Sequence, residues 1–132
     1  MGLSWAVPKA LPLLDPGLPA TKAHTIRLVD GLLATVYNDM DILTQRLPEY
    51  KGSITNLCAA VSWNDGQSWK KVVCVEEDVQ SGMQMNNPYA VQSGCLLYVV
   101  YTKTFISSAM SSQRGQGSVL GVKLAVVNLQ DL

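Results

Sequence analysis

Two carboxylates, Asp39 and Asp41, stand two residues apart just after a predicted strand, Leu32–Tyr37. Loops at strand ends often carry functional groups, and carboxylates there could serve as general acid and base or as hydrogen-bond ligands. More commonly, a run such as Asn38 to Asp41 forms a turn or a helix cap, in which short polar side chains bind backbone N–H groups. Both interpretations stay open on the sequence alone.

The other reactive side chains show no catalytic or metal-binding spacing. His24 is the one histidine and has no partner at the spacing of a metal site or a triad, so we expect a structural role for it. The sequence contains no Gly-rich phosphate loop, no CxxC pair and no HExxH helix. We therefore expect neither a metal nor a cofactor. The acidic run Glu76 to Asp78 is expected to be a solvated turn, although one glutamate there could line the rim of a site.

Three cysteines are an odd number, which argues against a framework of disulfides. If Trp63 pairs with Trp69 across a hairpin, Cys58 falls opposite Cys74 on the same face. The two could form a disulfide in an oxidising compartment. We favour the alternative, in which they are two small buried apolar residues. Cys95 is expected to begin a buried strand.

Residues 62–69, Ser-Trp-Asn-Asp-Gly-Gln-Ser-Trp, predict a tight polar turn between two strands, which we call the polar hairpin. Gly66 stands where a positive φ is needed. Asn64 is placed to bind backbone N–H groups across the turn, and Trp69 is placed to pack back over it. This hairpin specifies local architecture and, by itself, no reaction.

The composition is that of a well-buried β-rich chain, with 48% hydrophobic and 15% charged residues. Ten basic and ten acidic residues cancel, so we expect no nucleic-acid or anionic-membrane partner. The longest apolar run, Cys95 to Tyr101, is far shorter than the roughly 18–20 residues of a membrane helix. Met1 to Leu14 lacks a charged start and contains two prolines, so it does not read as a signal peptide. A cytoplasmic location is the default expectation.

Strands are predicted along most of the chain, so the expected fold class is all-β. Asp30-Gly31 and Ser93-Gly94 mark two hairpin turns. Residues Asp39 to Leu47 could form one or two helical turns before Pro48. Loops are expected over Glu76 to Asn87 and Ser107 to Gly117. The expected strands are Thr25–Val29, Leu32–Tyr37, Ile54–Trp63, Trp69–Val75, Pro88–Gln92, Cys95–Thr102 and Val119–Val127.

The strand pattern repeats after about 64 residues. Ile26 to Tyr37 is similar to Tyr89 to Tyr101, and Leu57 to Ser62 is similar to Lys123 to Asn128. We therefore divide a single domain, 1–132, into three parts. Residues 1–23 form an outer strand of a preceding unit and a linker, residues 24–76 form a complete four-stranded unit, and residues 77–132 form a second, incomplete one.

The order of motifs resembles the carboxy-terminal blades of BNR-repeat (aspartate-box) sialidase-like proteins. Their hairpin signature is Ser-x-Asp-x-Gly-x-Thr-Trp, matched here by Ser62, Asn64, Gly66, Ser68 and Trp69 together with Asp65, although Asn64 and Ser68 replace Asp and Thr. The other motifs, in order, are Ser-Trp-x-x-Pro, Pro-Leu-x-x-Pro-Gly, Ile-Arg-Leu-x-Asp-Gly, Asn-Pro-Tyr-Ala-Val and Val-Lys-x-x-Val-Val. The resemblance covers nearly the whole chain and implies a partial β-propeller of about two four-stranded antiparallel blades.

The resemblance also implies a chemistry. Sialidases hold a substrate carboxylate with arginines and use a tyrosine nucleophile assisted by a glutamate, with an aspartate as acid and base. Arg27 would be the pocket cation, since bidentate arginine suits a carboxylate, although a strand arginine facing solvent is the commoner case. Asp39 and Asp41 would be acid/base groups or ligands of sugar hydroxyls. The nucleophile position aligns with Met85, and the nearby Tyr89 is displaced from it. Arg46 and Arg114 lie in loops and are expected at the surface.

Size limits what this chain can do alone. Propellers close with about 4–8 blades, and two blades leave apolar faces uncovered. We expect a glycan or sialoside-like ligand, and either the remaining blades or further copies of the chain as partners. The resemblance implies a sialidase-like glycosidase segment. The alternative is a propeller segment that binds glycans or proteins without catalysis.

Overall fold

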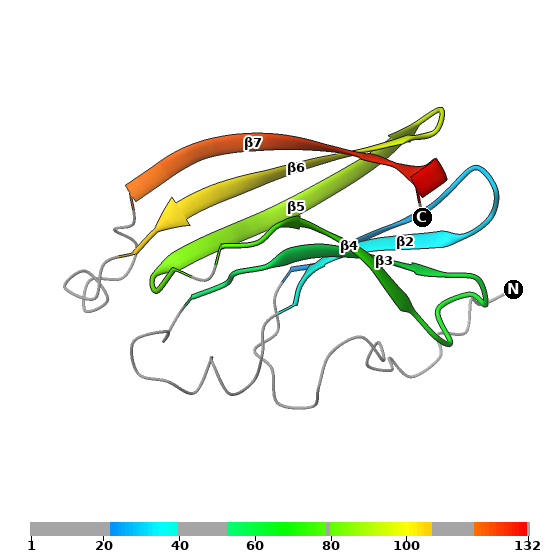
Figure 1. Cartoon of the computed structure of the whole chain (residues 1–132), viewed down its shortest axis with the longest axis horizontal. Coiled ribbons are helices and arrows are strands. Elements are labelled where there is room, and N and C mark those ends of the chain that lie inside the picture. The colour runs from blue at the N-terminus through cyan, green and yellow to red at the C-terminus, as the bar shows by residue number, and fades with distance from the viewer. Residues whose placement is uncertain (1–21, 40–52, 79, 107–117, 132) are drawn as a thin grey trace, which may run out of the picture.

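The computed structural model describes residues 22–39, 53–78, 80–106 and 118–131, and the statements below concern these residues (Figure 1). They form two antiparallel β-sheets, so the all-β prediction is confirmed. A short 3-10 helix, Leu129–Asp131, follows the last strand. Among the described residues, no helix has the length and apolar character needed to cross a membrane.

The first sheet is a four-stranded meander in which each strand pairs with the next along the chain. Its two central strands are buried almost throughout, whereas its edge strands are half exposed, which is the pattern of a sheet covered on both faces. The strands are β1 (His24–Arg27), β2 (Leu33–Asn38), β3 (Leu57–Ser62) and β4 (Lys70–Glu76).

The second sheet has three longer strands in the order β5-β6-β7. Buried and more exposed residues largely alternate along β5 and β6, so one face of this sheet is packed and the other faces solvent. The strands are β5 (Met83–Ser93), β6 (Leu96–Phe105) and β7 (Ser118–Asn128).

The two sheets lie one over the other, with β5 against β1 and β2 (Figure 1). The core between them is apolar, and several of its side chains are completely buried. Near one end, Ile54 bridges the sheets by accepting the N–H of Met85 at 2.7 Å and donating to the carbonyl of Met83 at 2.9 Å. The most buried core residues are Val36, Leu57, Met85, Leu97 and Val99.

Both hairpin turns form as predicted, and Gly31 and Gly94 have φ of 94° and 59°. The predicted start of β5 is wrong: the predicted loop Glu76 to Asn87 contains the first residues of β5, because Met83 and Met85 are core residues. Regular pairing in β3 begins only at Leu57, after an isolated bridge at Ile54. The predicted helical turns over 40–47 and the outer strand within 1–21 lie outside the described residues.

Cys58 and Cys74 pair across β3 and β4, as predicted, and they are joined by a disulfide. The interpretation of them as two separate buried thiols is therefore wrong. Cys95 is free and exposed in the β5–β6 turn, so the prediction that it starts a buried strand is also wrong. The turn ends one residue later than expected, and β6 begins at Leu96.

Candidate functional site

The polar hairpin connects β3 and β4 through side-chain hydrogen bonds to its own backbone. Ser62 Oγ accepts the N–H of Gly66 at 2.8 Å, and Asn64 Oδ1 accepts the N–H of Ser68 at 2.9 Å. Asn64 Nδ2 donates to Ser68 Oγ at 2.8 Å, and Trp69 Nε1 donates to the carbonyl of Gly66 at 3.1 Å. The turn is thus closed from both sides by short polar side chains.

Backbone geometry explains the glycine in this turn. Gly66 has φ of 84°, which glycine adopts at little cost, and the preceding Asp65 has φ of 53°, which Asp tolerates better than most residues. The Trp69 ring lies against Gly66, 3.7 Å from where a Cβ would stand. These are the contacts expected from the sequence for this hairpin.

Arg27 lies at the end of β1 and binds the polar hairpin. Its guanidinium donates to Asp65 Oδ1 at 2.9 Å and to the carbonyl of Gly31 at 2.8 Å. Both side chains of the ion pair are largely exposed, at 57% and 76%, so the pair adds at most about 1 kcal/mol of stability. Arg27 therefore faces solvent and already has a carboxylate partner.

Asp39 follows the other end of the same sheet. Because Arg27 pairs with Leu33 and Asp39 follows Asn38, about six residues of strand, roughly 20 Å, separate their positions along the sheet. Asp39 accepts a hydrogen bond from Lys71 at 2.7 Å, which raises the pKa of that lysine. Asp41, Arg46 and Arg114 lie outside the described residues.

Tyr89 lies on β5, at the edge where the two sheets meet. Tyr89 is 60% exposed, and its ring lies tilted against His24, with ring centroids 4.4 Å apart. His24 Nδ1 accepts the N–H of Ala90 at 3.0 Å, which fits the structural role expected for the histidine. Met85, aligned with the nucleophile of sialidases, is completely buried in the core. Arg27, Asp39 and Tyr89 thus lie in three separate places.

An ion cluster that the sequence did not predict joins the sheets at the end of β4. Lys103 Nζ bridges Glu76 at 2.5 Å and Asp78 at 2.7 Å, and Lys123 reaches Glu76 at 2.9 Å. The hydroxyl of Tyr101 also donates to Glu76. The expectation of a solvated turn is therefore wrong for Glu76 and Asp78. The sequence feature that could have indicated this cluster is the spacing of Tyr101 and Lys103, which are two residues apart and so lie on one face of a strand.

The electrostatics of this cluster oppose catalysis. Burial acts to raise the pKa of Glu76, but hydrogen bonds from Lys103, Tyr101 and Lys123 outweigh it and lower the pKa to about 2. Burial and the bond to Glu76 raise the pKa of Tyr101, which is 4% exposed. A nucleophilic tyrosine needs an accessible hydroxyl and a partner basic enough to take its proton. Tyr101 and Glu76 have neither property, so they act as a clamp between the sheets.

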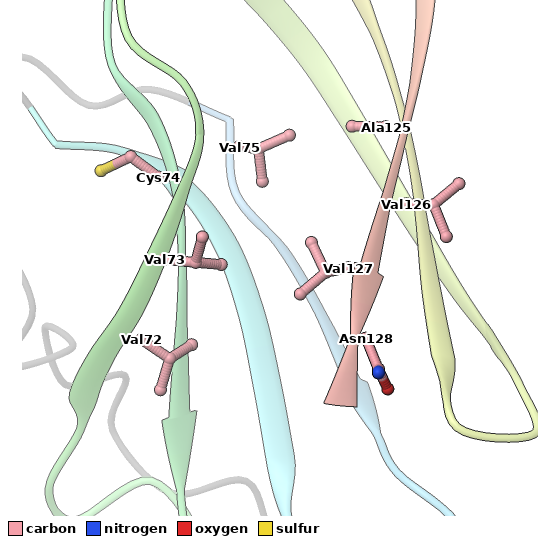
Figure 2. Close-up of a pocket in the computed structure, with 8 residues that line it drawn as sticks. All are labelled: Val72, Val73, Cys74, Val75, Ala125, Val126, Val127 and Asn128. Atoms are coloured by element: carbon pink, nitrogen blue, oxygen red, sulfur yellow. The ribbon is translucent and has the colours of Figure 1, made fainter. Parts of the chain in front are cut away.

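A pocket of about 310 Å³ opens between β4 and β7 (Figure 2). Figure 2 shows Val73 and Val75 on one strand and Val127 on the other turned toward this space. Its lining is apolar except for Asn128 at one end, and its one cysteine is in the disulfide. The described residues include no group of three or more side chains suited to hold a metal. The pocket therefore offers apolar contact and no reactive group.

Comparison of the chain with protein-family models, with curated proteins and with solved structures finds no match.

Proposed function

We propose that this chain is a pair of consecutive blades of a sialidase-type β-propeller, and that it recognises carbohydrate without hydrolysing it. The observation that carries the proposal is the polar hairpin. The bonds among Ser62, Asn64, Gly66, Ser68 and Trp69 have the form expected of an aspartate box, at the β3–β4 connection of a four-stranded meander.

The relation between the two sheets supports the blade interpretation. Two side-chain bonds link β1 and the turn that follows it to β5: His24 accepts from Ala90, and Gln92 accepts the N–H of Val29 at 2.8 Å. These contacts advance in the same direction along both strands, so β1 and β5 run parallel. At the opposite edge, β4 and β7 leave a pocket between them. Two antiparallel meanders that stack with their first strands parallel are arranged as neighbouring propeller blades are.

The choice of recognition over hydrolysis rests on the side chains. Arg27 is neutralised by Asp65, Asp39 by Lys71, and the buried Tyr101–Glu76 pair has the wrong acidity for a nucleophile and its base. The exposed Tyr89, whose ring lies against His24, presents an aromatic face of the kind that packs against a sugar ring in a binding site.

The test is a titration of the intact chain with 3′-sialyllactose, followed by two-dimensional NMR, and a parallel assay with a fluorogenic sialoside. We expect saturable shifts of the Tyr89 amide and its neighbours on β5, loss of binding in Tyr89→Ala, and no turnover. Trp63→Ala is the control, because it removes an aromatic ring that is also 60% exposed. If the wild-type chain hydrolyses the fluorogenic sialoside and the Tyr101→Phe variant does not, the chain is an enzyme and the proposal is wrong. Absence of sialoside binding would favour the protein-interaction alternative.

A further inference from the structure

The outer face of the second sheet is an uncovered apolar surface. Of the nine large hydrophobic side chains that are exposed in the described part of the chain, seven lie on β5, β6 and β7. The other two, Val29 and Trp63, lie in turns of the first sheet. The seven are Tyr89, Val91, Val100, Leu120, Val122, Leu124 and Val126, and we call them the outer face.

Strand register makes the outer face continuous. Tyr89 pairs with Val100, and Val100 pairs with Leu124, so these three form a row across the sheet. Val91, Tyr98 and Val126 form the next row, with Val91 and Val126 exposed and Tyr98 half-buried. Directly opposed side chains on one sheet face lie about 5 Å apart and contact one another. The rows therefore form one patch rather than scattered exposed residues.

The outer face carries no charge that would oppose association with another face, although β5 contains Pro88 and the β6–β7 pairing contains a bulge. Its exposed residues carry no charge, and β7 is an edge strand of eleven residues. The one charged residue of β7, Lys123, reaches Glu76 in the other sheet. Natural proteins usually place charges, prolines or a covering element at such edges. A contiguous uncharged patch of this kind marks an interaction surface.

The first sheet has a similar apolar face, and that face is covered by the second sheet. The row Ile26, Ala34 and Val61 crosses β1, β2 and β3, as the row Tyr89, Val100 and Leu124 crosses β5, β6 and β7. In the first sheet, this row packs against the core shared with the second sheet. The row Tyr89, Val100 and Leu124 of the second sheet is exposed, and another apolar sheet face could cover it in the same way.

A second copy of this chain supplies such a face. The far face of the first sheet is unavailable, because Thr35, Tyr37, Cys58 and Ala60 are each at most 3% exposed. The outer face of another copy is available, and an uncharged apolar face is self-complementary, as a two-fold interface requires. Three strands of about ten residues cover roughly 480 Å² in projection. Their contoured surface is larger and comparable to the about 800 Å² that each partner buries in a standard interface.

We propose that two copies of this chain pack their outer faces together across a two-fold axis. The dimer is centred on β6 and β7, and Tyr89 lies at its rim on β5. This inference rests on packing and register alone, so it stands or falls separately from the proposed carbohydrate recognition.

Light scattering on the purified chain over a range of concentrations tests the dimer. We expect twice the 14.3 kDa mass of one chain, and the monomer mass for Leu124→Lys, with a dissociation constant raised at least tenfold. Val29→Lys is the control: it changes a residue that is 89% exposed and lies outside the face, and it should leave the dimer intact. Circular dichroism checks that both variants keep their sheets.

A second measurement locates the interface. Cys95 is the free thiol among the three cysteines, and a spin label there should give one narrow distance between two copies. A monomer at high concentration, or equal loss of the dimer in Val29→Lys, would overturn the proposal. Sialoside binding measured on Leu124→Lys separates the two proposals, because the carbohydrate proposal expects binding at Tyr89 to persist when the dimer is lost.

Discussion

At the scale of single residues, Asn64 uses both ends of its amide to close the polar hairpin. The oxygen accepts from the Ser68 N–H and the Ser62 hydroxyl, at 2.9 and 3.0 Å, and the nitrogen donates to Ser68 Oγ. An aspartate could keep the two accepted bonds and take a third from the Ser68 hydroxyl, which is free to rotate. Asparagine is therefore a faithful replacement for the aspartate of the signature.

Substitutions of Asn64 should separate hydrogen bonding from charge. Asn64→Asp should change the free energy of unfolding by less than about 0.5 kcal/mol, since the bonds are kept. Asn64→Ala should lower it by about 1–3 kcal/mol, because three bonds are lost and partly buried partners stay unpaired. Urea unfolding measures both values, and Gln67→Ala in the exposed part of the turn is the control. Equal stability of the Ala and Asp variants would show that the network has no energetic role.

At the scale of elements, the Cys58–Cys74 disulfide joins β3 to β4 and closes a loop across the polar hairpin, with a sequence separation of 16. A loop of this size restricts the unfolded chain and contributes about 3 kcal/mol to stability. Disulfides persist mainly in oxidising compartments.

The double variant Cys58→Ser and Cys74→Ser should lose about 3 kcal/mol of unfolding free energy in urea. Cys95→Ser, which changes an exposed free thiol, should lose almost none. Alkylation of the denatured, unreduced chain followed by mass spectrometry should label one cysteine, and all three after reduction. Three labels before reduction would contradict the bridge.

Elements governed by local chemistry could be predicted from the sequence, and contacts between sheets could not. Asp30-Gly31 and the polar hairpin form because their turn residues accept a positive φ, and the pairing of Cys58 with Cys74 follows from the hairpin register. Glu76 and Lys103 meet only because one sheet lies over the other, which no local pattern encodes. The separation of Arg27 from Tyr89 is likewise a property of the stacking.

At the scale of the whole molecule, the ion cluster of Glu76, Asp78, Tyr101, Lys103 and Lys123 holds the two sheets together. Hydrogen bonds from Lys103, Tyr101 and Lys123 outweigh burial and lower the pKa of Glu76 from its ordinary 4.5 to about 2. A carboxyl group whose pKa is lowered by folding stabilises the protein above its unfolded pKa, and that contribution is lost as the pH falls toward the folded value. The relevant window is therefore pH 4.5 down to about 2.

Between pH 4.5 and about 2, the free energy of unfolding of the wild-type chain, measured with urea, should fall by on the order of 2–3 kcal/mol beyond the general effect of acid. Glu76→Gln should be less stable at pH 7, because Lys103 and Lys123 lose their shared partner, and its stability should fall less steeply below pH 4.5. The Glu77→Gln variant is the control, since Glu77 is exposed beside the cluster. Parallel pH profiles for wild type and Glu76→Gln would contradict the clamp.

The arrangement of the two sheets as neighbouring blades is the claim on which the proposed function depends, and a crystal structure of the intact chain tests it most directly. We expect β1 and β5 to lie side by side and parallel, with His24 bonded to Ala90 and the polar hairpin closed by Asn64. Sheets packed with β1 and β5 antiparallel, or at opposite edges, would contradict it.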